Sequence, residues 1–272
     1  MTDSPLVSVV VPTLNSERYL ERCLKSVKMQ TYSNIEIIVV DNYSTDTSMK
    51  IAEKYADVVL TKGPERSAQV NFGVKNSKGE YVYRVDSDFV LELTVVEEAV
   101  RKCENNGIDA ICVHNTSDST VSFWAKVRNL ERDCYEYDDL TVAARFIRKK
   151  VFELMGGFNE SIVAAEDYDL HNKLISNGFK IGFIHSKELH IGEPNSLGEI
   201  VVKHYYYGKS IRHFLASNSD RGRRQLNPIR LSLLRNLNLF AKNPVLAFGF
   251  LVYQTVRYVS AGFGFFIEEI SR

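Results

Sequence analysis

The chain has 272 residues, of which 44% are hydrophobic, so it is long enough for one large α/β domain or for a domain with an appendage. Its 34 basic and 34 acidic residues cancel, which argues against a general nucleic-acid-binding protein. The four cysteines show no C-x-x-C spacing and the first residues show no export signal, so we expect an intracellular protein with reduced cysteines.

The first 115 residues alternate short apolar strands with helices. Residues 6–11 and 35–40 are β-branched runs typical of parallel strands buried on both faces, and apolar residues between them recur at helical spacing. Further along, Thr94 and Glu97 have the spacing of a capping box at the start of a helix. After the second strand, the pattern predicts a helix at 45–55, a strand at 57–60, a helix at 66–76, a strand at 80–85, a helix from 94 and a strand at 110–113. This alternation is typical of a nucleotide-binding α/β half.

Three polar clusters follow predicted strands, namely residues 12–15, Asp41, and the pair Asp86 and Asp88. Ligands of open α/β sheets bind beyond the carboxyl ends of the strands, so we expect these clusters to converge on one edge. Because residues i and i+2 of an extended backbone point to the same side, Asp86 and Asp88 can share one divalent cation. Acidic pairs with this spacing also occur in turns, where they cap helices or face water. The neighbouring clusters favour a site for a metal and a diphosphate.

Residues 114–140 are less regular, polar and aromatic, and they contain the only tryptophan, Trp124. A segment of this kind beside a strand-end site either shapes an acceptor pocket or forms a surface helix that packs the tryptophan inward. The sequence leaves both possibilities open.

The C-terminal segment is first basic and then apolar. Residues 221–267 contain no Asp or Glu, but they contain seven positive charges. These are Arg221, Arg223, Arg224, Arg230, Arg235, Lys242 and Arg257. The chain as a whole has no net charge, but its C-terminal segment is basic.

The apolar residues of this tail predict helices that lie on a membrane. Five of them within 233–241 share one helical face. Residues 243–256 and 258–267 are each shorter than the ~20 residues of a spanning helix, and Arg257 between them is costly inside a bilayer. The flanking positive charges favour an anionic membrane surface. The alternative is that the segment packs on the preceding domain or forms a dimer interface.

The order of five segments resembles the family-2 glycosyltransferases of the GT-A fold, across roughly residues 5–215. The segments are residues 7–15, 38–46, 79–88, 156–160 and 166–170. Each segment by itself matches the family only weakly, but the occurrence of all five in this order is specific to the family. The resemblance implies a Rossmann-like catalytic domain over residues 1–215, with a mostly parallel central sheet flanked by helices. Residues 216–272 would form a basic, amphipathic helical tail that associates with a membrane.

The resemblance also implies a pocket for the base and ribose of the donor, lined by Pro12, Thr13, Asn15 and Asp41. An ionised carboxylate at a strand end can accept a hydrogen bond from an N–H of uracil or guanine. The alternative is that Asp41 only caps the turn that follows. Asp86 would also lie near the ribose.

By the same resemblance, Asp86 and Asp88 would hold Mn²⁺ or Mg²⁺ against the donor diphosphate, and His190 would add a further ligand unless its role is structural. Related sequences often carry an Ala-Arg-Asn triplet where this chain has residues 69–71, so the arginine of that helix is missing. Arg66 would replace it and pair with the donor phosphates, unless it is a solvated residue at the start of the helix.

Asp167 matches the catalytic base of the family, which takes the proton of the acceptor hydroxyl. Glu166 would orient Asp167 or contact the acceptor, and two adjacent carboxylates can raise one another's pKa. The alternative is that both residues only favour the N-terminus of a helix. A base that attacks no carbon implies direct displacement, so we expect inversion at the anomeric carbon.

Together these features predict an inverting, metal-dependent hexosyltransferase of glycan biosynthesis. It would move a sugar from a UDP- or GDP-sugar to a hydroxyl or phosphate of a polyprenyl- or dolichyl-linked acceptor, as a peripheral or monotopic protein at the cytoplasmic face of the cell membrane. Two alternatives remain open: a soluble transferase with a saccharide or protein acceptor, and a non-catalytic nucleotide-sugar-binding protein. A dehydrogenase or nucleotidyltransferase is disfavoured because no glycine-rich loop follows the first strand.

Overall fold

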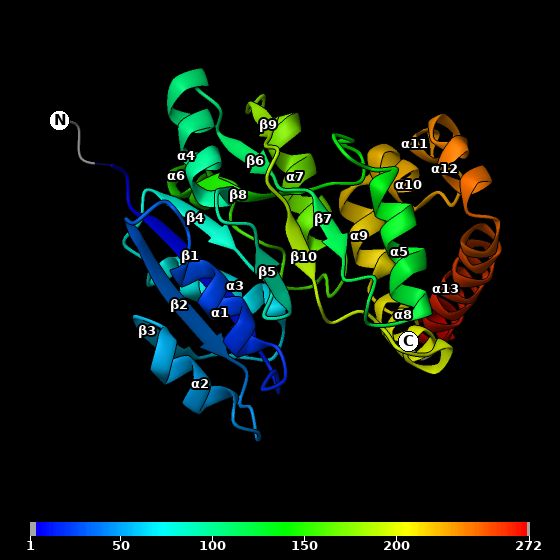
Figure 1. The fold of residues 1–272 in the computed structure, drawn as a ribbon, viewed down its shortest axis with the longest axis horizontal. Helices are drawn as coiled ribbons and strands as arrows, with labels where there is room; N and C mark the ends of the chain where they lie inside the picture. The colour runs from blue at the N-terminus through cyan, green and yellow to red at the C-terminus, as the bar shows by residue number, and fades with distance from the viewer. Residues whose placement is uncertain (1–3, 271–272) are drawn as a thin grey trace.

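The structure is a computed structural model that describes residues 4–270. Its centre is a seven-stranded sheet in the order β3-β2-β1-β4-β8-β6-β9, flanked by helices (Figure 1). The strands are β1 (Val7–Thr13), β2 (Ile35–Asp41), β3 (Val58–Thr61), β4 (Tyr81–Arg84), β6 (Ala110–Cys112), β8 (Ala144–Arg148) and β9 (Ile181–Phe183). Among these seven, β8 alone lies antiparallel to its neighbours, so the predicted α/β architecture with a mostly parallel sheet is confirmed.

The alternation of side chains along the strands builds a core on each face of the sheet. Val9 and Ile37 point to one face, whereas their neighbours Val10 and Ile38 point to the other. The first core is closed by α1 (Leu20–Lys28), α2 (Ser48–Tyr55) and α4 (Val95–Asn106). The second core is closed by α3 (Arg66–Lys75), α6 (Lys149–Leu154) and α7 (Glu166–Ser176). Burial on both faces explains why the strands are continuously apolar in the sequence.

The strands and helices predicted before residue 115 are present, but the capping box is not. The helix α4 begins at Val95 as expected, yet no side-chain bond caps it. The Thr94 hydroxyl instead lies 2.6 Å from the hydroxyl of Ser186, and Glu97 accepts a hydrogen bond from Thr31. Tertiary partners therefore outcompete the local cap at this helix start.

A second, three-stranded sheet lies beside the first and was not predicted from the sequence. Its order is β5-β10-β7, with β5 (Phe89–Leu91), β10 (Glu188–His190) and β7 (Asn115–Ser117). Each strand has only three residues, too few for a periodicity to be recognised. This sheet brings His190 alongside Phe89, so it joins two segments that lie far apart in the chain.

The segment 114–140 contains β7 and then a helix, α5 (Phe123–Asp133). Trp124 packs with Val127, Ile200 and Tyr253 in a small apolar cluster. Arg128 and Arg132, on the same helix, line a cavity described below. The helix therefore packs its tryptophan inward, which is one of the two predicted possibilities, and it also contributes arginines to a cavity.

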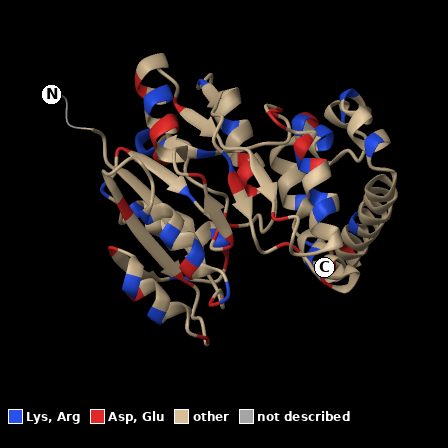
Figure 2. Ribbon diagram, viewed as in Figure 1, with Lys and Arg blue, Asp and Glu red and all other residues tan. Residues whose placement is uncertain are grey.

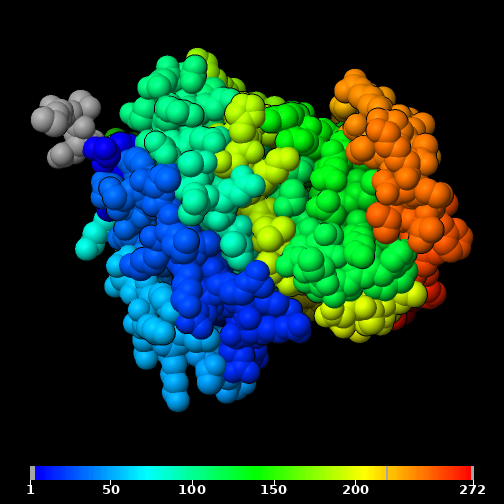
Figure 3. Space-filling view, viewed as in Figure 1, coloured from blue at the N-terminus to red at the C-terminus, as the bar shows by residue number. Residues whose placement is uncertain are grey.

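Six helices follow the sheets and form one side of the molecule, beside α5 (Figure 3). They are α8 (Leu197–Gly208), α9 (Ile211–Ser217), α10 (Ser219–Leu226), α11 (Leu231–Arg235), α12 (Leu237–Lys242) and α13 (Pro244–Ile270). The predicted boundary between residues 215 and 216 falls within α9.

Two details of the predicted tail were wrong. Residues 233–241 do not share one helical face, because the backbone leaves the helix at Asn236, and residues 244–267 belong to one helix rather than to two pieces.

The helix α13 packs against α8 and α5. Glycines make the first contact close: a Cβ atom at Gly208 would overlap the backbone of Ala261, and one at Gly264 would overlap the backbone oxygen of Tyr205. The outward side of α13 is apolar and largely free of charge (Figure 2). Its exposed large apolar residues are Val245, Phe248, Leu251, Val259, Phe263, Phe266, Ile267 and Ile270. None of the helices within residues 4–270 combines the length and apolar character needed to cross a membrane.

Candidate active site

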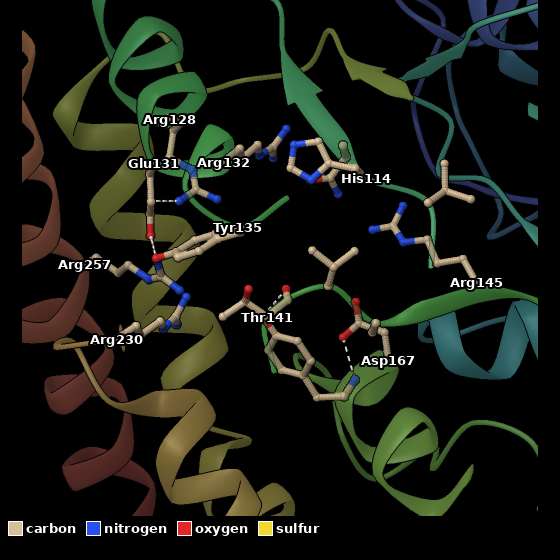
Figure 4. A pocket seen from close by; sticks show the side chains of 15 residues that line it. His114, Arg128, Glu131, Arg132, Tyr135, Thr141, Arg145, Asp167, Arg230 and Arg257 are labelled. Atoms are coloured by element: carbon tan, nitrogen blue, oxygen red, sulfur yellow. Dashed lines mark hydrogen bonds and ion pairs between the residues drawn. The ribbon is translucent and has the colours of Figure 1, made fainter. Parts of the chain in front are cut away.

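A cavity of about 650 Å³ opens where β4 ends, between the sheets and the C-terminal helices. A smaller cavity of about 140 Å³ adjoins it and shares several of its lining residues (Figure 4). Asp86, Asp88, Arg66, Asp167 and His190 all line the larger space. The structure thus brings together, in one cavity, the predicted metal, phosphate and base residues, which come from four separate parts of the chain.

The four residues predicted to bind the donor's base and ribose lie at the ends of β1 and β2. Thr13 and Asp41 are direct neighbours in the sheet, and both are buried. The Asp41 Oδ2 atom accepts a hydrogen bond of 2.8 Å from the backbone N–H of Ser44, whereas its Oδ1 atom is buried without a hydrogen-bond partner among the described residues. Asp41 therefore does cap the turn, and it keeps one oxygen that a ligand N–H can satisfy.

The other two residues of this group hold the loop in place. Asn15 adopts a left-handed backbone, its N–H donates to the Ser44 hydroxyl, and its side-chain oxygen accepts from the N–H of Thr45. Pro12 is buried within β1 opposite Val40. Both therefore shape the end of the sheet rather than the larger cavity.

Asp86 is surrounded by three arginines. Arg84 donates to both of its carboxylate oxygens at 3.0–3.1 Å, while Arg66 and Arg145 each approach Oδ2 to 3.7 Å. Burial by itself raises the pKa of Asp86, but the three guanidinium groups outweigh it and hold the pKa well below its usual range. Asp86 is therefore ionised, and its charge is shared with Arg84, which the sequence did not single out.

Asp88 is in direct contact with His190. The His190 Nε2 atom lies 2.9 Å from Asp88 Oδ2, and its Nδ1 atom lies 2.7 Å from an oxygen of Glu193. Arg132 in turn pairs with that Glu193 oxygen at 2.9 Å. Burial raises the pKa of Glu193, but Arg132 and His190 hold it well below its usual range. A carboxylate on Nδ1 fixes the ring so that Nε2 points at Asp88, an arrangement common behind metal-bound histidines.

The chemistry of Asp88 and His190 fits a hard divalent cation, although no metal cluster is preformed. Within residues 4–270, no three His, Cys, Asp or Glu side chains converge closely enough to hold an ion by themselves. Mg²⁺ and similar ions are commonly bound by one or two carboxylates together with substrate phosphates and water. Asp88 and His190, with Asp86 beside them, would therefore hold the ion jointly with a diphosphate.

Glu166 and Asp167 occupy different environments although they are adjacent. Glu166 is 1% exposed, and one of its oxygens lies 2.6 Å from Arg66 and 2.9 Å from Arg84. Asp167 lines both cavities, and among the described residues its side chain accepts only one hydrogen bond, to Oδ1 from the N–H of Tyr168. Glu166 is thus part of the buried arginine network, whereas Asp167 faces the open space.

Arg66 occupies the first position of α3 and bridges Glu166 and Asp86. It lines the cavity beside Asp88, where the phosphates of a ligand can reach it. On the same helix, Gln69 donates to the backbone oxygens of Thr13 and Val40. The helix that lacks the expected arginine therefore ties together the ends of β1 and β2.

Several site residues carry no sequence signal. Arg145 lies on β8, Arg132 on α5 and Glu193 just after β10, none of them within a motif. Further arginines come from α5, the segment before α11, and α13. Charged residues of this kind are indistinguishable from solvated ones until the tertiary structure buries them.

Comparison with known proteins gives a family and a fold. Residues 8–158 match the family described as Glycosyl transferase family 2. The chain is 29% identical over 259 residues to chondroitin synthase from Escherichia coli, an alignment that covers 86% of this chain and 35% of that enzyme. The chain therefore spans about a third of the length of that relative.

Two solved structures superpose on most of the chain. The mannosyltransferase PcManGT from Pyrobaculum calidifontis, in complex with GDP-Man and Mn²⁺, has a TM-score of 0.66 at 14% identity, covering 96% of this chain and 88% of that one. Residues 1–349 of S. aureus TarS, in complex with UDP-GlcNAc, have a TM-score of 0.59 at 19% identity, covering 88% and 76%. At these identities the likeness concerns the fold.

Proposed function

The chain belongs to glycosyl transferase family 2, and we propose that it moves a hexose from a UDP- or GDP-sugar to a lipid-linked acceptor with inversion at the anomeric carbon. The family, the GT-A fold and the enzyme class predicted from five sequence segments are confirmed. The donor, the metal and the acceptor belong to the proposal.

One observation carries the proposed mechanism. Asp88, paired with His190, and Asp167, free of any basic partner within ion-pair distance among the described residues, line the same cavity. The first pair suits a cation and a diphosphate, and the second carboxylate suits a proton acceptor. When bound, Mn²⁺ or Mg²⁺ would offset the charge that develops on the leaving nucleoside diphosphate.

The chain's own residues would perform the remaining steps. Asp167 takes the proton of the acceptor hydroxyl while that oxygen bonds to the anomeric carbon, and the bond from this carbon to the diphosphate breaks with its electron pair on the diphosphate. Arg66 holds the phosphates, and the unpartnered oxygen of Asp41 accepts a hydrogen bond from the base. Support for a UDP or GDP donor comes from the solved structures with UDP-GlcNAc and GDP-Man.

Thermal unfolding of the full chain with UDP or GDP, with and without Mn²⁺, tests this proposal. We expect one nucleotide to raise the midpoint only when Mn²⁺ is present, and Asp88→Ala to abolish the increase. Asp220→Ala, on the exposed side of α10, is the matched control. Equal protection without the metal would contradict the role of Asp88, and no protection by either nucleotide would contradict the proposed transfer.

We further propose that the apolar outward side of α13 lies on the cytoplasmic face of a membrane and presents the cavity to a polyprenyl- or dolichyl-linked acceptor. In support, the polar residues Gln254 and Arg257 of this helix face inward, whereas Phe248 and Phe263 are 70% and 62% exposed. The outward side of α13 is thus apolar, whereas the outward side of a helix that only packs on a core is polar. An exposed apolar side of this kind suits a lipid surface.

Co-sedimentation with vesicles that contain an anionic phospholipid tests the membrane proposal. We expect Phe248→Glu combined with Phe263→Glu to lower the bound fraction several-fold. Leu154→Glu, which changes an equally exposed residue on the distant helix α6, is the control. If the double variant binds as well as the wild type, or if the wild type ignores vesicles and dimerises, the membrane proposal is wrong.

A saccharide acceptor is the second candidate. The E. coli relative is named for the synthesis of chondroitin, a polysaccharide, and its alignment covers 86% of this chain. A transfer assay with soluble oligosaccharides and with polyprenyl-linked saccharides decides between the two acceptors, because turnover with the soluble acceptors alone would favour the second.

A further inference from the structure

The smaller cavity is lined by an unusual concentration of arginines that the reaction described above does not use. Arg128 comes from α5, Arg230 from the segment between α10 and α11, and Arg257 from α13. Figure 4 shows Arg230, Arg257 and Glu131 gathered at one end of this cavity, with Asp167 across it. We call Arg128, Arg230 and Arg257 the arginine cluster.

One carboxylate, Glu131, contacts two of the three arginines. Glu131, which is 0% exposed, pairs with Arg128 and lies 3.3 Å from Arg257. Burial raises the pKa of Glu131, but the three arginines outweigh it and lower the pKa to about 2, so this single negative charge is permanent at neutral pH. Glu131 also accepts a hydrogen bond from the hydroxyl of Tyr135. The cluster therefore has three positive charges against one negative charge.

Arg230 has no carboxylate of its own. Its guanidinium donates to the backbone oxygens of Gln225 and Asn227 and lies over the ring of Tyr135, at 5.1 Å. No Asp or Glu between residues 4 and 270 comes within ion-pair distance of it, although its side chain is 5% exposed overall. A buried guanidinium without a counter-ion is costly, so its environment favours an anion.

A neutral polar group completes the wall of the cavity. His114 is 3% exposed, and neither of its ring nitrogens has a hydrogen-bond partner among the described residues. Burial lowers the pKa of His114 to about 4, so the ring is neutral at pH 7 and has one donor and one acceptor to offer. Buried polar atoms are normally bonded, which points to a ligand in this space.

We propose that the arginine cluster binds an anionic group of the acceptor, a phosphate or a carboxylate, and thereby positions the acceptor hydroxyl at Asp167. The inference rests on the proposed glycosyl transfer and specifies its acceptor. An anion suits this site because guanidinium groups bind phosphate and carboxylate through paired N–H donors. The same cavity holds Asp167, so an acceptor held by its anion lies beside the proposed base.

Binding of inorganic phosphate to the full chain tests the cluster without requiring turnover. The titration is made with Mn²⁺ and saturating nucleotide, UDP or GDP, so that the donor's own phosphate contacts are filled. We expect Arg230→Gln and Arg257→Gln each to weaken phosphate binding about tenfold or more, because each removes a charge-assisted contact. Arg235→Gln, an exposed arginine on α11, makes the same change of net charge and should bind phosphate as the wild type does.

Two variants are used so that the test remains valid if one of them misfolds. Arg230 donates to two backbone oxygens, so its loss can disturb the loop, whereas Arg257 donates to Glu131 and to no backbone oxygen within residues 4–270. Phosphate affinity unchanged in Arg257→Gln would overturn the proposal even if Arg230→Gln does not fold. If nucleotides protect the protein but both variants keep wild-type phosphate affinity, the anion site alone fails. If no nucleotide binds, the proposed transfer fails instead.

Competition then identifies the source of the anion. A soluble sugar phosphate or a glucuronate-containing disaccharide that displaces phosphate would indicate a soluble anionic acceptor. Displacement only by vesicles that contain a polyprenyl phosphate would indicate a lipid-borne one. If neither displaces phosphate, the bound phosphate is adventitious and the proposal is overturned.

Discussion

Asp167 differs from the other described carboxylates that line the two cavities, because no basic side chain lies within ion-pair distance of it. Asp86 is shared by three arginines, Asp88 and Glu193 contact His190, and Glu131 is held by Arg128. A carboxylate that already neutralises a cation is a poor proton acceptor, whereas an unpaired one in a partly enclosed site can act as a base.

Asp167→Asn should therefore lower the rate of transfer about 100-fold or more while changing nucleotide affinity by less than about twofold, because the amide keeps the shape but cannot take a proton. Single-turnover transfer and calorimetric titration with nucleotide and Mn²⁺ measure the two effects. Asp46→Asn, on a carboxylate outside the cavities, serves as the control. A variant that retains most of its turnover would exclude Asp167 as the base.

Glu193 acts on the proposed metal site through another residue. It lies 2.7 Å from His190 Nδ1 and is 3% exposed, so it holds the orientation of the ring whose Nε2 atom points at Asp88. Glu193→Gln should weaken Mn²⁺ binding about 10- to 100-fold, as is typical for the partner of a metal-bound histidine. Titration of the nucleotide-bound protein, followed by the electron paramagnetic resonance of free Mn²⁺, measures this. Glu53→Gln, an exposed change on α2, is the control, and equal Mn²⁺ affinity in both variants would reject the positioning role.

At the scale of helices, the cavity depends on how closely α13 approaches α8. Gly264 has no space for a side chain because a Cβ atom there would overlap the backbone oxygen of Tyr205, and Gly208 meets Ala261 in the same way. Gly262, two residues earlier on α13, has nothing within 4 Å of its Cβ position. Gly264 and Gly262 thus provide a crowded and an open position on the same helix.

Gly264→Ala should lower the free energy of unfolding by about 1–3 kcal/mol, since the helices must separate to admit the methyl group. Gly262→Ala should leave it unchanged or raise it by about 0.5–1 kcal/mol, because alanine favours the helix. Urea unfolding followed by circular dichroism compares the two variants. Equal stability would show that the contact between α8 and α13 is looser than described.

The arginine cluster also exists only because of helix packing. Arg257 on α13 and Arg128 on α5 reach the same carboxylate since the two helices lie side by side. The C-terminal segment therefore forms a wall of the cavity in addition to the proposed membrane contact. Its basic character, which predicts attraction to anionic lipids, is divided between an inward cluster and exposed residues such as Arg235.

At the scale of the whole molecule, buried histidines make the fold sensitive to acid. Burial lowers the pKa of His114 and of His171 from 6.5 to about 4. The unfolded chain therefore binds protons on these residues that the folded chain does not, so stability is full above about pH 6.5 and falls as the pH drops toward 4. Each such histidine contributes a slope of about 1.4 kcal/mol per pH unit within this window.

His114→Gln should reduce that slope by about 1.4 kcal/mol per pH unit between about pH 6 and pH 5, because the side chain no longer titrates. Urea unfolding at several pH values measures it. His185→Gln replaces an exposed imidazole and provides the matched comparison. If His114→Gln keeps the full wild-type slope, His114 is protonated within the fold and its burial does not hold it neutral.

The sequence by itself determined the parts of this protein that have a local period. Continuous β-branched runs predicted β1 and β2, helical spacing predicted α1, and the alternation of side chains predicted that Asp86 and Asp88 follow a strand together. The order of five short segments predicted the family. These features depend on residues that are close in the sequence, so they can be predicted without knowledge of the fold.

Only the tertiary structure decided which charges meet. The small sheet has strands of three residues, too short for a period, yet it brings His190 to Asp88. Arg128, Arg230 and Arg257 are widely separated in the chain and gather around Glu131 through the packing of α5 and α13. A charged residue has the same local pattern whether it is solvated or buried, because its environment is set by residues distant in the sequence.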